Sequence, residues 1–188
     1  MAKHLHELIV FSEDFSLVNS PAFYDCVVHL ICTGGTGRFL YNNRLFTMSK
    51  NDIAVISRPQ LVTDMQADDE FRCEYIAAPD KFLHNLLPAN NYAIYGCVSL
   101  FENPIIKVSE IDAGRFRTDL ANIKYRIDNT DHRFYQELMG SLLQTMIYDL
   151  FDFHAKTNDN ILTTDRVGYI TAQFFTLIEG GRPNFRCL

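Results

Sequence analysis

The pattern of apolar residues along the chain changes once, near Val108. Before this point, apolar residues occur in short runs rich in β-branched and aromatic side chains. After it, they recur every three or four residues, which is the spacing of one face of an α-helix. The pattern predicts an α+β fold, in which a small antiparallel β-barrel or jelly roll (cupin-like) is followed by about three helices.

The strand pattern is clearest between residues 23 and 79, in five short runs bounded by Gly, Asn, Asp or Pro. Asn42-Asn43 predicts a tight hairpin, because Asn tolerates positive φ. Gly34-Gly35-Thr36-Gly37 predicts a turn. It is not a phosphate-binding loop, because a strand pattern follows it in place of Gly-Lys-Ser/Thr and a helix.

The remaining segments of the first half are less regular. Residues 1–22 are expected to form an arm, in which residues 8–11 could add a strand. We expect a polar loop over residues 60–70 and a short helix starting at Pro79-Asp80. Residues 92–100 and 104–108 are expected to supply closing strands.

Helical spacing predicts helices over about residues 110–128, 130–154 and 163–179. The middle helix has two adjacent apolar stripes, whereas packing on a barrel requires one. The second stripe indicates cover from flanking helices or from another subunit. We expect one stripe to contribute to a two-fold dimer contact, through Phe134, Leu138, Leu142 and Met146.

Composition limits the classes of function. The chain has 188 residues and a formal net charge of −6, the wrong sign for a surface that binds DNA unaided. No apolar run approaches the ~20 residues that span a membrane, and the N-terminus lacks the apolar core of a signal peptide. The odd number of cysteines, five, favours free thiols in a reducing cytoplasm.

A few polar side chains interrupt the apolar strands and are candidates for a ligand pocket. His29 is flanked by apolar residues on both sides, so it is either a hydrogen-bonded core histidine or a group aimed at a ligand. Arg72 and Glu74 share one face of a strand, which lies either in solvent or toward the barrel interior. The candidate pocket residues are His29, Tyr41, Arg58, Arg72 and Tyr75.

The order of these features resembles the N-terminal cupin-type sensor domain of AraC-type transcription regulators. The resemblance covers about residues 20–180 and rests on the Gly35-Thr36-Gly37 turn, the hairpin, the Lys50-Asn51-Asp52 corner, the strand ending at Arg58-Pro59 and the helices that follow. The family usually has Pro-Gly-Asp at the corner and Pro-Gly after the strand. Here Ser49-Lys50-Asn51-Asp52 and Pro59-Gln60 stand in those places.

The resemblance implies a small-molecule effector inside the barrel, a homodimer formed through the helices, and no catalytic activity or cofactor. It also implies DNA binding through a C-terminal pair of helix-turn-helix motifs, which this chain lacks. Either the chain is part of a longer protein in which these motifs follow, which we favour, or it is a natural sensor-only form. The expected division is a barrel with its arm over residues 1–108, a helical dimerisation and linker region over 109–181, and a tail over 182–188.

The alternative is a free-standing metal-free cupin enzyme, similar to sugar epimerases or isomerases, or a small-molecule-binding protein. Metal-binding cupins resemble one another in a His-x-His after a glycine, which is absent after Gly37. His4 and His6 alternate, but no third metal ligand is in view. Metal-free epimerases use a His–Asp base facing a Tyr acid, which His29 with Tyr41 or Tyr75 could imitate. No feature of the sequence pairs His29 with a carboxylate.

Overall fold

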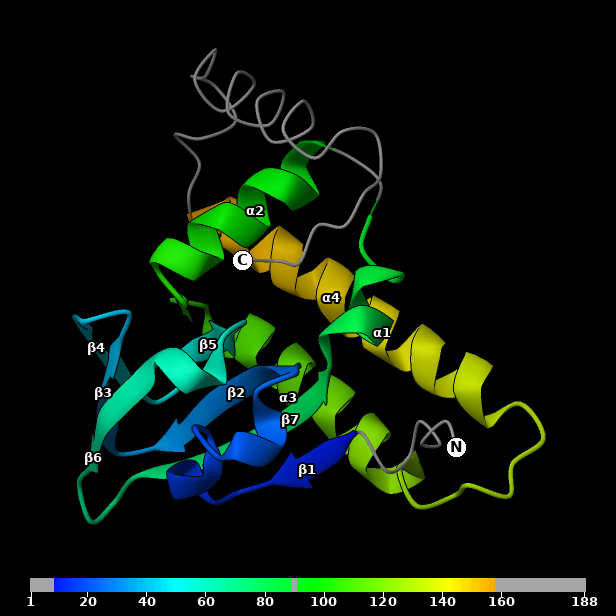
Figure 1. The fold of residues 1–188 in the computed structure, drawn as a ribbon, viewed down its shortest axis with the longest axis horizontal. Helices are drawn as coiled ribbons and strands as arrows, with labels where there is room; N and C mark the ends of the chain where they lie inside the picture. Colours follow the sequence, from blue (N-terminus) through cyan, green and yellow to red (C-terminus); the bar gives the residue numbers. More distant parts are fainter. Residues whose placement is uncertain (1–8, 89–90, 158–188) are drawn as a thin grey trace.

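The computed structural model of the chain describes residues 9–88 and 91–157, which form two antiparallel sheets and four α-helices (Figure 1). The predicted fold class is confirmed. The strands are β1 (Val10–Ser12), β2 (Cys26–Gly34), β3 (Thr36–Tyr41), β4 (Arg44–Ser49), β5 (Ile53–Ile56), β6 (Val62–Ala67), β7 (Arg72–Pro79) and β8 (Ile105–Ile106). The helices are α1 (Asp80–His84), α2 (Asn91–Glu102), α3 (Glu110–Arg126) and α4 (Tyr135–Thr157).

Strand alternation divides the interior into two cores. One sheet has the order β1-β7-β2-β5-β8 and the other the order β4-β3-β6. On β2, Val28, Leu30 and Cys32 point into the core between the sheets, while Val27 and Ile31 join the core on the opposite face. This is the expected consequence of side chains alternating along a strand, and it places a buried layer on both faces of the five-stranded sheet.

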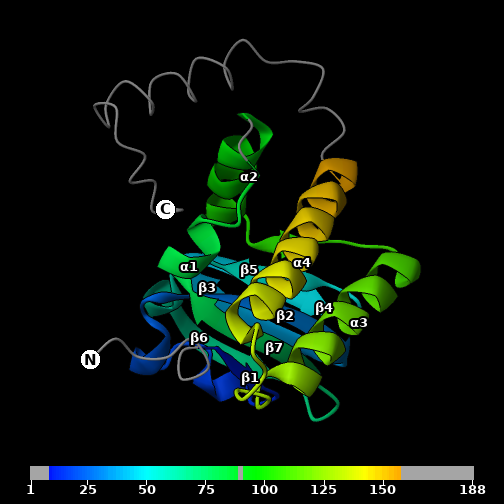
Figure 2. The same ribbon diagram turned by 90° about the vertical axis from the view of Figure 1, so that its right-hand side faces the viewer.

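The helices supply the second core by covering one face of the five-stranded sheet, as Figures 1 and 2 show together. The helix α3 is preceded by Ser109, whose hydroxyl accepts a hydrogen bond from the Asp112 amide at 3.1 Å, a typical N-cap. Its buried positions follow the predicted helical spacing: Ala113, Phe116, Leu120 and Ile123.

The predicted turns are confirmed. Asn42 and Asn43 have φ of 49° and 61°, and they join β3 to β4 in a two-residue hairpin. Gly35 joins β2 to β3 with a φ of 64°, and a Cβ added there would lie 2.3 Å from the amide nitrogen of Phe71. A larger residue would therefore be excluded by both conformation and space.

Two predicted elements are wrong. Residues 92–100 lie in the helix α2, because their inward positions, Ala93, Gly96 and Leu100, are spaced three and four apart. Residues 62–67, expected to be a polar loop, form β6 at the edge of the three-stranded sheet. A strand that is mostly exposed needs few apolar residues, so its sequence resembles that of a loop.

Other boundaries are adjusted. The closing strand expected over 104–108 is limited to the two residues of β8, and the long helix begins at Tyr135 instead of residue 130. The arm contributes β1, which pairs with β7. The expected third helix over 163–179, the tail, and the residues before Ile9 lie outside the described residues.

Candidate functional site

A cavity of about 60 Å³ lies between the five-stranded sheet and the helices. Strands β2 and β5 and the residue after β5 form one wall, with Val27, His29, Val55 and Ser57. The opposite walls come from the α1 region, α2 and α4, with Asp80, Leu83, His84, Leu87, Cys97, Leu100, Ile147, Leu150 and Phe151. Most of the lining is apolar, with a few polar groups, which is the usual character of small-molecule sites.

His29 is the most deeply buried polar group of this cavity. Its position on β2 places it on the same face as Val27, so it points toward the helices, and it is 4% exposed. Its Nδ1 is buried and has no hydrogen-bond partner among the described residues. Burial lowers the pKa of His29 to about 4, so the imidazole is neutral at pH 7.

His84 brings a second imidazole to the same cavity from the last turn of α1. Its Nδ1 is also buried without a hydrogen-bond partner in the described part of the chain. Buried polar atoms normally have a partner, from the protein or from a bound molecule. Two residues with such atoms line this one cavity, between the sheet and α1.

Two close contacts join α2 to α4 where they line the cavity. A Cβ added at Gly96 would lie 2.6 Å from Cε1 of Phe151, so the glycine allows the two helices to approach. One helical turn away, Nε2 of His154 lies 3.0 Å from Oγ of Ser99. Any molecule that enters the cavity meets both of these helices.

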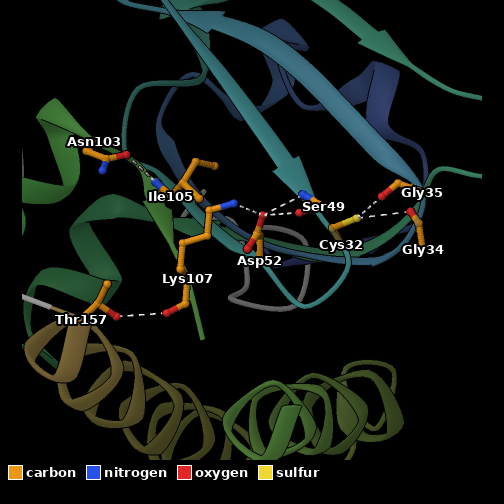
Figure 3. A network of polar contacts seen from close by, with 9 residues as sticks. All are labelled: Cys32, Gly34, Gly35, Ser49, Asp52, Asn103, Ile105, Lys107 and Thr157. Carbon is orange, nitrogen blue, oxygen red and sulfur yellow. Dashed lines mark hydrogen bonds and ion pairs between the residues drawn. The ribbon is translucent and has the colours of Figure 1, made fainter. Parts of the chain in front are cut away.

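The end of α4 is tied to the sheet through a network of polar contacts that includes Lys107 (Figure 3). The buried carboxylate of Asp52 accepts hydrogen bonds from the Ser49 amide at 2.7 Å and from Lys107 Nζ at 2.5 Å. The carbonyl oxygen of Lys107 accepts a hydrogen bond from Oγ1 of Thr157 at 3.0 Å. The network connects the corner between β4 and β5 with the last described turn of α4.

The residues predicted to line one pocket are divided between the two cores. His29 lines the cavity, while Tyr41 and Tyr75 are buried between the sheets. The hydroxyl of Tyr75 donates to the carbonyl oxygen of Asp14 at 3.0 Å. Tyr41 reaches the cavity indirectly, because its hydroxyl lies 3.2 Å from Oγ of Ser57.

The two predicted arginines lie elsewhere. Arg58 is half-buried and near Tyr41, where its charge opposes the rise in the pKa of the phenol caused by burial. Arg72 is exposed and donates hydrogen bonds to the carbonyl oxygens of Asp69 and Phe71, at 3.0 and 2.7 Å. These contacts hold Arg72 at the surface.

The four residues predicted for a dimer contact differ in exposure. Phe134 precedes α4 and is 60% exposed, and Leu138 and Leu142 are half-buried. Met146 is fully buried in the core between the helices and the sheet. The exposed part of the predicted stripe is therefore its N-terminal end.

Several cavity residues were not expected from the sequence, among them Ser57, Asp80 and His84. The sequence does contain a pattern that points to Asp80 and His84. They lie four residues apart, on one face of a short helix that is otherwise apolar on that face. Ser57 carries no such signal, because it ends a strand like many other serines.

Comparison with known proteins gives similarity at the level of structure only. The chain matches no known protein family, and no curated protein resembles it in sequence. It is similar in structure to the AraC-like transcriptional activator CuxR, with 9% identity and a TM-score of 0.47, over 92% of this chain and 59% of that one. A ToxT variant from Vibrio cholerae, in its apo form, matches with 14% identity and a TM-score of 0.38, over 87% of this chain. The match covers 59% of each of the two longer proteins.

The described residues contain no cluster of three or more His, Cys, Asp or Glu side chains that could hold a metal ion. None of their helices is long and apolar enough to cross a membrane. Cys26, Cys32, Cys73 and Cys97 form no disulfide bond within the described part of the chain, and Cys187 lies outside it.

Proposed function

We propose that this chain is the effector-binding and dimerisation domain of an AraC-type transcription regulator, that it acts in the cytoplasm, and that it has no catalytic activity of its own. The observation that carries the proposal is the buried imidazole of His29, whose Nδ1 has no hydrogen-bond partner among the described residues, in an apolar cavity between the sheet and the helices. Such a cavity binds a small molecule, because burying a polar atom without a partner is unfavourable.

The position of the cavity favours a sensor. Its walls belong to the sheet on one side and to α2 and α4 on the other, so a bound molecule affects how α4 packs. An effector that binds one arrangement of α4 more tightly than another shifts the equilibrium toward the arrangement that it binds better. The helix α4 leads toward the C-terminal part of the chain, and a regulator would transmit the change to a DNA-binding domain in this direction.

DNA is assigned to a helix-turn-helix domain that follows this chain in the whole protein. The acidic character of the chain supports this division of labour, because phosphate binding requires positive charge. The homodimer is assigned to the N-terminal end of α4 and the preceding loop, where Phe134 is exposed. A two-fold contact at this point would bring both copies of α4 together.

An enzyme of the metal-free cupin type is less well supported. That mechanism requires a histidine base facing a tyrosine acid. His29 faces the helices, while Tyr41 and Tyr75 belong to the core between the sheets. The arrangement of these three side chains therefore favours binding over catalysis.

The test is a thermal-unfolding screen of the purified chain against a panel of cellular metabolites. A ligand present at about a hundredfold its dissociation constant stabilises the folded state by about 2.7 kcal/mol, which raises Tm by roughly 5–10 °C for a protein of this size. Hits are repeated with Val27→Phe, which fills the cavity with a larger side chain, and with Val10→Phe on the exposed face of β1 as the matched control.

The proposal expects at least one metabolite that stabilises the natural chain and Val10→Phe, but not Val27→Phe. A screen in which stabilisation persists in Val27→Phe would place the binding site elsewhere. Turnover of a hit compound by the purified chain would contradict the non-catalytic assignment.

A further inference from the structure

We propose that the cavity is selective for an uncharged, mainly apolar molecule with a hydroxyl or carbonyl group, and that this group forms a hydrogen bond with the imidazole of His29. This inference rests on the proposed function, in which the cavity is the effector site. It adds the chemical class of the ligand, which the proposed function leaves open.

The apolar part of the ligand follows from the walls. Aliphatic and aromatic side chains of β2, β5, α2 and α4 surround most of the space. When a hydrocarbon group enters the cavity, its own surface and the surface of the lining are both removed from water. The volume of about 60 Å³ is several times that needed for one water molecule, for which roughly 10–15 Å³ suffices. A single bound water would therefore leave much of the cavity empty.

The polar part of the ligand follows from the two imidazoles. Nδ1 of His29 and Nδ1 of His84 are both buried without a partner in the described residues, and both side chains line this cavity. An imidazole nitrogen either donates or accepts, depending on the tautomer. A hydroxyl pairs with either state, and a carbonyl pairs with the donor state.

The absence of net charge on the ligand follows from the ionisable groups in the lining, which are Asp80, His29, His84 and the thiol of Cys97. An anion would be repelled by the Asp80 carboxylate, and His29 supplies no compensating charge because burial keeps it neutral. A cation would have to leave water for a mostly apolar space. The one carboxylate of the lining, Asp80, already interacts with other groups of the protein, so pairing with a cation would compete with those contacts.

The experiment is a titration of the ¹⁵N-labelled chain, followed by NMR, with probes that share one carbon skeleton. The probes are 1-butanol, butyrate and butylamine at pH 7.5, with 1-chlorobutane as a probe of the same length that lacks a hydroxyl. We expect 1-butanol to bind at least tenfold more tightly than butyrate or butylamine, with shifts at residues of β2, α2 and α4.

The variant His29→Phe keeps an aromatic ring and removes Nδ1. Its expected effect is about a tenfold loss of 1-butanol affinity, the usual consequence of losing one hydrogen bond in a buried site, with 1-chlorobutane unaffected. His132→Phe, at an exposed histidine outside the cavity, is the matched control and should bind like the natural chain.

The outcomes separate this inference from the proposed function. Equal or tighter binding of butyrate or butylamine at the cavity, or equal weakening of 1-butanol and 1-chlorobutane in His29→Phe, overturns the ligand class while the cavity remains a binding site. If none of the four probes shifts any cavity residue, both the cavity site and the ligand class are wrong.

Discussion

Nε2 of His154 on α4 lies 3.0 Å from Oγ of Ser99 on α2, so a buried polar contact joins the two helices beside the cavity. The contact between Gly96 and Phe151 lies one turn away on the same pair of helices. Together these contacts fix the distance between α2 and α4. The shape of the cavity therefore depends on helix packing as well as on its own lining.

The first prediction tests the close approach of α2 and α4. In Gly96→Ala the new methyl group overlaps the Phe151 ring, so we expect lower stability despite the better helix propensity of Ala. Gly114→Ala on α3 is the matched control, because nothing lies within 4 Å of its added Cβ, and it should gain about 0.5–1 kcal/mol. Urea denaturation followed by circular dichroism measures both. A stabilised Gly96→Ala would mean that the two helices are not in close contact.

The second prediction concerns pH. Oδ2 of Asp119 on α3 is buried without a hydrogen-bond partner in the described residues, and burial together with the nearby Asp149 carboxylate raises the pKa of Asp119 to about 6. This pKa is above the unfolded value of 3.8. The contribution of protonated Asp119 to the stability of the fold is therefore complete below pH 3.8 and is lost as pH rises through 6. In Asp119→Asn this loss should disappear, so the variant should be more stable than the natural chain at pH 8.

The comparison must be made between the two proteins at each pH, because His29 acts in the opposite direction. Its pKa is lowered by burial from 6.5 to about 4, so its contribution is complete above pH 6.5 and is lost as pH falls toward 4. This effect is common to both proteins and cancels in their difference. A difference in unfolding free energy that is constant from pH 4 to pH 8 would show that Asp119 is not perturbed.

The third prediction addresses the anchor at the end of α4. Asp52→Asn weakens three contacts of a buried carboxylate, two with Ser49 and one with Lys107, and should cost about 2 kcal/mol of stability. Lys107→Met removes one of these contacts from a side chain that is 60% exposed, so its cost should be lower, about 1 kcal/mol or less. Denaturation midpoints of the two variants decide the order. The reverse order would assign the anchor to Lys107 instead of the buried carboxylate.

The fourth prediction concerns the dimer. Phe134→Ser should shift the protein toward monomer in sedimentation experiments, because it removes an exposed apolar group at the proposed contact. Tyr125→Ser on α3 is the control, since Tyr125 is also strongly exposed and lies on a different helix. Leu142 is a poorer choice, because it also packs against the core and its loss would weaken the fold. Equal effects of the two serine variants, or none, would remove the proposed contact.

The amino-acid sequence was sufficient for most strands of the first half and for the helices α3 and α4, because the apolar period changes near Val108, but it missed α2, which precedes that change. It was also sufficient for the burial of His29, which has apolar neighbours on both sides. It could not show which core His29 joins, since both faces of β2 are apolar and alternation alone does not distinguish them.

The errors have related causes. The segment that forms α2 contains Tyr, Ile and Val, which favour strands, although its inward positions are spaced as in a helix. The cavity likewise requires residues from five elements to meet, and no local pattern records that meeting.

The most direct test of the effector site is the ¹⁵N signal of the His29 and His84 side chains, recorded while a stabilising metabolite is added. If the cavity binds the effector, both imidazole signals shift and saturate at the concentration at which Tm stops rising. Imidazole signals that stay unchanged while Tm reaches its plateau would contradict the account, because the ligand would then occupy another site.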